Sequence, residues 1–149
     1  MEHTVLANND LPTVSYSLGR LDRLVSQHLS EALKPLGVSL PQFTMLSHLA
    51  RRGATANASL AARSFISPQA ANQIVNTMIL HGWVSKQNDP NHGRMVLIDL
   101  TATGLAVYQR CMAEAEAFEQ TMLAGLLPEN VMMLRSTLQR LLDNLNQRG

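Results

Sequence analysis

The sequence predicts a mainly α-helical fold with one small β-hairpin. Apolar residues recur at spacings of three and four along most of the 149-residue chain, as on one face of a helix. The spacing changes to two between residues 83 and 100, where two apolar runs flank a polar stretch. A hydrophobic fraction of 46% with 15% charged residues suits a buried core and is too apolar for a disordered chain. We therefore expect one globular domain over 1–149.

The first two helices are predicted by their apolar stripes and by residues that start or stop a helix. The first covers about 12–32, and Gly37 lies beyond its end. Ser39 and Gln42 resemble a capping box at the start of the second helix, which Gly53 closes.

Two further start signals predict a third and a fourth helix. Thr55 is the candidate N-cap of a short third helix. Ser67 followed by Pro68 combines a hydroxyl N-cap with proline at the first helical position. This fourth helix is expected to run to about His81, with Gly82 beyond it.

The hairpin comes next, with strands expected at 83–87 and 95–100 and a projecting polar loop at 88–93. Thr101 opens a long helix whose apolar face continues to Pro128, and a leucine-rich amphipathic helix follows.

The terminal helices, 12–34 and 102–149, carry leucine-rich stripes outside the middle module, 39–101. Packing these stripes against each other and against a second copy of the chain would cover them. The sequence therefore predicts a two-fold dimer.

The middle module has the element order of a winged helix-turn-helix, in which the second helix of the pair enters the major groove. The segment between Leu40 and Thr101 contains five basic residues and two acidic ones. This local excess of positive charge favours an anionic partner such as nucleic acid.

The predicted fourth helix carries four carboxamides at positions i, i+3, i+4 and i+7, opposite its apolar face. They are Gln69, Asn72, Gln73 and Asn76. A carboxamide offers a donor and an acceptor together, which matches the N6/N7 edge of adenine. These side chains are candidates for base reading; the alternative is an ordinary solvated surface.

Three stretches of the sequence are specific in combination: LPQFTMLSHLARRG, LAARSFISPQAANQIVNTMILHGWV and DPNHGRMVLIDLTATG. In these stretches the sequence resembles the MarR (multiple antibiotic resistance regulator) family of bacterial transcription regulators. The resemblance covers nearly the whole chain and implies a homodimeric DNA-binding regulator. The commonest pattern in the family is a repressor of a pseudo-palindromic operator that a small-molecule ligand releases.

The wing stretch is the most diagnostic part of the resemblance. Asp89, Arg94 and Thr101 stand where family wings carry an aspartate, an arginine and a helix-opening threonine. The resemblance implies that Arg94 reaches the minor groove and that Asp89 braces the wing by pairing with an arginine. Phe65 stands where the family usually has a glycine between the two helices. Helix amides with one wing arginine predict an A·T-rich operator.

Two further groups of candidates are less specific. The candidates for DNA backbone contacts are Arg63, Ser67 and Lys86. The alternative for the basic ones is an ordinary solvated surface residue. The candidates for a ligand pocket that an aromatic acid could use are Tyr16, Arg20, His28 and His48. The alternative for His28 is a histidine of the core or the dimer interface.

No enzyme motif, paired-cysteine metal site or membrane-length apolar run occurs in the sequence, so we expect no enzyme, no cofactor, no metal and no membrane partner. The lone Cys111 and a start without a leader predict a bacterial cytoplasmic protein, associated with the nucleoid when bound. Two alternatives stay open: a redox-responsive regulator acting through Cys111, and a winged module for protein contacts that does not bind DNA.

Overall fold

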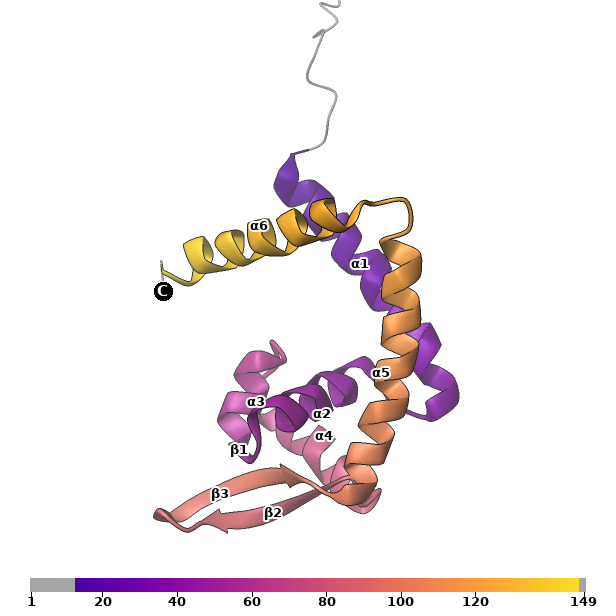
Figure 1. Cartoon of the computed structure of the whole chain (residues 1–149). Helices are drawn as coiled ribbons and strands as arrows, with labels where there is room; N and C mark the ends of the chain where they lie inside the picture. The colour runs from indigo at the N-terminus through magenta and orange to yellow at the C-terminus, as the bar shows by residue number, and fades with distance from the viewer. Residues whose placement is uncertain (1–12, 148–149) are drawn as a thin grey trace, which may run out of the picture. The chain divides into compact units, whose positions relative to one another are not determined.

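The computed structural model describes residues 13–147, and the helices and strands of this part follow one another along the chain as Figure 1 shows. The elements are α1 (Val14–Leu33), the 3-10 turn η1 (Lys34–Leu36), α2 (Leu40–Arg52), β1 (Thr55–Ala56), α3 (Asn57–Arg63), α4 (Pro68–Leu80), β2 (Val84–Asp89), β3 (His92–Leu100), α5 (Ala102–Met122) and α6 (Pro128–Asn146). The predicted fold class is confirmed. The predicted start of the first helix at residue 12 and the last two residues of the range 102–149 lie outside the described residues. The chain forms two compact units, one ending at Ala115 and one beginning at Glu116.

The predicted starts of α2 and α4 are confirmed by their capping hydrogen bonds. At α2 the Ser39 amide donates to Gln42 Oε1 (2.9 Å) and the Gln42 amide donates to Ser39 Oγ (3.3 Å), which completes the capping box. At α4 the Ala70 amide donates to Ser67 Oγ (3.1 Å), and Pro68 is the first helical residue. Local sequence therefore determines where α2 and α4 begin.

The expected helix cap at Thr55 is wrong. Thr55 and Ala56 form a short strand that pairs with Ile98 and Leu97, so the sheet has three strands in the order β1-β3-β2. The Thr55 hydroxyl donates to the carbonyl of Gly53 (2.8 Å) instead of capping α3. Two residues are too few to show the alternation that marks a strand in sequence.

The wing is longer and its loop shorter than predicted, because β2 extends to Asp89 and β3 begins at His92. Figure 1 shows the two strands side by side as an extended ribbon that leads into α5. The pairing shifts between Asn88, which faces Val96, and Asp89, which faces His92, so residues 93–95 bulge from the ladder. The outer part of the wing, residues 85–88 and 92–96, is exposed, so burial imposes no apolar alternation there that would reveal the full length of the strands.

One apolar core holds the unit that ends at Ala115. It gathers buried side chains from α2, α3, α4, the wing base and α5, among them Phe43, Met45, Leu46, Leu49, Leu60, Val75, Met78, Trp83, Val84, Ile98, Val107 and Cys111. The wing is tied to α5 at Thr101, whose amide donates to the Trp83 carbonyl (3.0 Å) and whose Oγ1 accepts from the Gly104 amide (3.0 Å). These hydrogen bonds fix the base of the wing against the start of α5.

The unit that begins at Glu116 holds the end of α5 and all of α6, joined by an ion pair between Arg135 and Glu119 (3.6 Å). Within this single chain α6 has no buried residue, and its leucines are exposed except for Leu141, which is half-buried. The apolar residues of α1 are likewise exposed as far as Leu24. Each of these helices therefore presents an apolar face that its own unit leaves uncovered. No helix within 13–147 combines the length and apolar character needed to cross a bilayer.

Candidate nucleic-acid interface

The second helix of the helix-turn-helix, α4, separates its two faces as the sequence predicts. Ala71, Val75 and Met78 are buried in the core. The four carboxamides are all exposed: Gln69, Asn72, Gln73 and Asn76. The start of α4 is also tied to the start of α3, because the Asn57 side-chain amide donates to the carbonyl of Pro68 (3.0 Å). The amides thus project from a helix that is held in place by its opposite face.

Lys86 brings positive charge to this surface from the wing. Its ammonium group donates to Asn76 Oδ1 (3.4 Å), which joins β2 to the C-terminal half of α4. Ser67 is exposed at the other end of α4, where its Oγ caps the helix. A candidate for contacts with the DNA backbone therefore lies at each end of the row of amides.

Arg94 lies in the bulge of the wing and is exposed, beside a shallow hollow that it lines with His92, Gly93 and Met95. Asp89 does not make the expected pair with an arginine. Its carboxylate accepts the Asn91 amide (2.8 Å), an Asx turn that stabilises the wing tip. Within residues 13–147 Asp89 is in no ion pair, so a hydrogen bond stabilises the wing tip where a salt bridge was expected.

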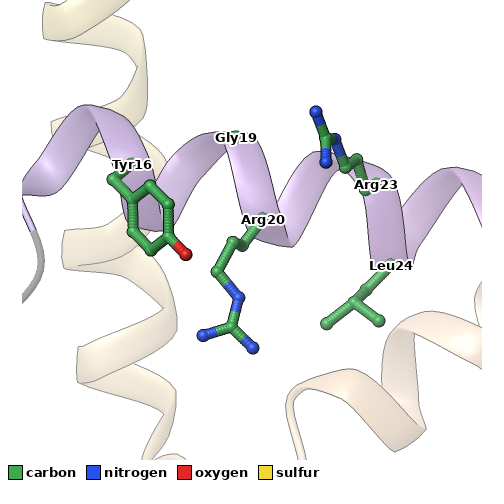
Figure 2. A pocket seen from close by; sticks show the side chains of 5 residues that line it. All are labelled: Tyr16, Gly19, Arg20, Arg23 and Leu24. Atoms are coloured by element: carbon green, nitrogen blue, oxygen red, sulfur yellow. The ribbon is translucent and has the colours of Figure 1, made fainter.

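The structure does not gather the four ligand-pocket candidates into one site. Tyr16 and Arg20 line a pocket of about 400 Å³ on α1, together with Gly19, Arg23 and Leu24. Figure 2 shows Tyr16, Arg20 and Leu24 on one side of α1 and Arg23 on the other. His28 is exposed on α1 and lines neither this pocket nor the one that contains His48.

His48 lines a second pocket of about 400 Å³ that α1, α2 and α3 form together. Its lining residues are Leu29, Leu40, Phe43, Thr44, Ser47, His48, Arg51, Arg52 and Arg63. None of its three arginines has an ion pair within the described residues. Burial, then Arg63 and Arg52, lower the pKa of His48, so the imidazole is neutral at pH 7 beside positive charge. The pocket thus combines an apolar floor with unpaired cations.

Arg63 was expected at the DNA backbone, yet it lies in the same pocket as His48. Arg51 and Arg52 also line this pocket, and the sequence was not expected to place them there. The signal was present, because they follow His48 by three and four residues and so share its helix face. The sequence did not show that Arg63, on α3, lines the same pocket as these two arginines.

Cys111 is a buried member of the core. Burial raises the pKa of its thiol, Arg110 lowers it and Glu114 raises it, with a net rise. A buried, protonated thiol is a poor nucleophile, which gives little support to a redox role. Across residues 13–147 no three His, Cys, Asp or Glu side chains come close enough to hold a metal ion.

A helix-turn-helix whose second helix exposes its amides, beside a two-stranded wing with an arginine near its tip, defines a winged helix-turn-helix DNA-binding protein. The sequence profile of the MarR family matches residues 36–95. The HTH-type transcriptional repressor Rv2887 of Mycobacterium tuberculosis strain H37Rv is 32% identical over 118 residues, which cover 79% of this chain and 84% of the relative. The multiple antibiotic resistance protein MarR of Escherichia coli K12 is 26% identical over 141 residues, 91% of this chain and 98% of the relative. The chain belongs to the MarR family of transcriptional regulators.

Solved structures agree with this placement. Rv2887 in complex with DNA superposes with a TM-score of 0.74 at 28% identity, covering 88% of this chain and 98% of that one. Rv2887 in complex with salicylic acid superposes with a TM-score of 0.73 at 30% identity, covering 89% of this chain and 98% of that one. Wild-type E. coli MarR in its apo form superposes with a TM-score of 0.78 at 22% identity, covering 89% of this chain and 99% of that one. At this identity the superposition shows a shared fold.

Proposed function

We propose that this protein is a homodimeric repressor that binds a pseudo-palindromic DNA operator and leaves it when a small aromatic acid binds. The exposed amide row of α4 carries the proposal, since these side chains face solvent while the opposite face of the helix builds the core. The relative Rv2887, a repressor by name, has been solved in complex with DNA.

In this proposal α4 lies in the major groove, and the amides of Gln69, Asn72, Gln73 and Asn76 read adenine edges. Ser67 and Lys86 contact phosphates at the two ends of α4. Arg94 enters the minor groove, where a narrow A·T-rich segment concentrates negative potential. Two-fold symmetry places the half-sites about 10 bp apart.

The pocket between α1, α2 and α3 is the proposed effector site. Its apolar residues, Phe43 among them, suit an aromatic ring, and its arginines suit a carboxylate. Rv2887 has been solved with salicylic acid and with p-aminosalicylic acid. Arg63 ends α3, directly before the turn into α4, so an acid that binds Arg63 would act on the position of the reading helix.

Selection from random duplexes tests the DNA-binding part. The wild-type protein is expected to select an A·T-rich pseudo-palindrome, and Asn72→Ala with Gln73→Ala is expected to relax or lose it. The matched control is Gln109→Ala with Gln120→Ala, which removes two exposed amides from α5. Selection of G·C-rich sites would contradict the proposed readout, and an unchanged motif in the α4 variant would contradict the role of the amides.

A regulator of this kind catalyses no reaction and works in the bacterial cytoplasm, at the nucleoid when bound.

The competing function is a winged module for protein contacts. Steep salt dependence of duplex binding separates the two, because each neutralised phosphate adds about 0.9 to the slope of log affinity against log salt.

A further inference from the structure

The turn between α3 and α4 closes with a hydrogen-bond pattern that demands a left-handed residue. The Ile66 amide donates to the carbonyl of Ala61 (3.1 Å) and the Phe65 amide donates to the carbonyl of Ala62 (3.4 Å). These two bonds make a Schellman motif with Phe65 at the position that glycine usually fills. Phe65 has φ of +54° and is the one non-glycine residue with positive φ in the described part of the chain.

Phe65 gains nothing inside its own chain in return for this strain. Its side chain is 96% exposed. Ile66, the next residue, provides the apolar contact that accompanies such a turn, because it packs against the core. A bulky aromatic residue in a left-handed conformation raises the energy of the folded state, and burial does not offset it here. The exposed ring is therefore available for a contact outside the chain.

The position and the surrounding charge indicate what that contact is. Phe65 lies two residues before Ser67, the N-cap of α4, and helices of this class approach base edges with their N-terminal residues. No acidic residue occurs in the sequence between Glu31 and Asp89, so this whole segment is complementary to a polyanion. A partner of that charge with apolar groups in reach is duplex DNA, whose thymine methyl groups line the major groove.

We propose that Phe65 packs against a thymine methyl group at the edge of the major groove and so adds a thymine to the sequence that α4 selects. The inference rests on the proposed function of α4 and names one further residue that determines its specificity.

The test compares two ring-deleting variants on the duplex that the wild-type protein selects. Phe65→Gly and Phe65→Asn both suit positive φ, so their Tm values are expected to equal or exceed that of the wild type. Their affinity for the duplex is expected to fall by about fourfold or more. Replacing the contacted thymine by deoxyuridine removes only its methyl group and should weaken the wild type by about fourfold, the effect of one buried methyl. The same replacement should leave the affinity of both variants unchanged.

Equal affinity of wild type and variants for the selected duplex would overturn the proposal. So would a scan in which no deoxyuridine replacement distinguishes wild type from variant. Asn72→Ala with Gln73→Ala is measured alongside: if it loses affinity while Phe65→Gly does not, the function of α4 stands and only the role of Phe65 fails. A wild-type protein that selects no duplex overturns both.

Discussion

The pKa of His48 depends on its burial and on the positive charge around it. Its pKa is lowered in the folded protein by burial and by Arg63 and Arg52. Below the ordinary value of about 6.5 the unfolded chain takes up a proton that the folded chain does not. Stability is therefore expected to fall as pH drops through about 6.5 toward the folded pKa.

His48→Gln removes this titration, so the loss of Tm between pH 7.5 and pH 5.5 should be smaller in the variant than in the wild type. Thermal melts at the two pH values measure the difference. The same loss of Tm in both proteins would show that His48 is not shielded from protons in the folded state.

Arg63 is the residue at which two roles can be separated. If it binds the effector, Arg63→Ala should reduce the response of the operator complex to salicylate about tenfold and leave the salt slope of DNA binding unchanged. If it contacts a phosphate, the slope should instead fall by about one. We expect the first result, because the structure places Arg63 with His48, Arg51 and Arg52. Titrations of a labelled duplex over a range of salt and salicylate concentrations give both quantities.

At the scale of elements, the joint between the wing and α5 depends on a close backbone approach. A Cβ at Gly104 would overlap the carbonyl oxygen of Trp83, which also accepts the Thr101 amide. Gly104→Ala is therefore expected to destabilise the fold by about 3 kcal/mol. The matched control is Gly19→Ala in α1, where a Cβ meets nothing within 4 Å and helix propensity favours alanine by about 1 kcal/mol. Chemical denaturation measures both, and a Gly104→Ala protein as stable as the wild type would contradict the tight joint.

Elements specified by their own residues are the ones that the sequence predicts well. The boundaries of α2 and α4 follow from local caps, and the amide face of α4 follows from helical spacing. β1 could not be predicted, because its two residues gain their partners from β3, about forty positions away in the chain. The pocket that we propose for the effector could not be predicted for the same reason, since Arg63 and His48 belong to different helices. Phe65 was visible as a missing glycine, but only the structure shows that it is both left-handed and exposed.

At the scale of the whole molecule, the uncovered apolar faces of α1 and α6 predict a dimer. The mass in solution is expected to be twice the chain mass of 16.4 kDa. Leu142, which is 54% exposed in the single chain, is expected to lie in the dimer interface. Leu142→Asp should shift the equilibrium toward the monomer, and Asn144→Asp adds the same charge to another face of α6 as a control. Light scattering coupled to size exclusion measures the mass, and a monomeric wild type at micromolar concentration would contradict the prediction.

The central claim is that the amides of α4 read DNA sequence. Its most direct test is the ratio of affinities for the selected operator and for a scrambled duplex of the same composition, measured with the wild type and with Asn72→Ala plus Gln73→Ala. We predict a ratio of about 1,000 or more for the wild type, which falls by at least tenfold in the variant as two base contacts are lost. A variant that keeps the wild-type ratio would contradict the claim.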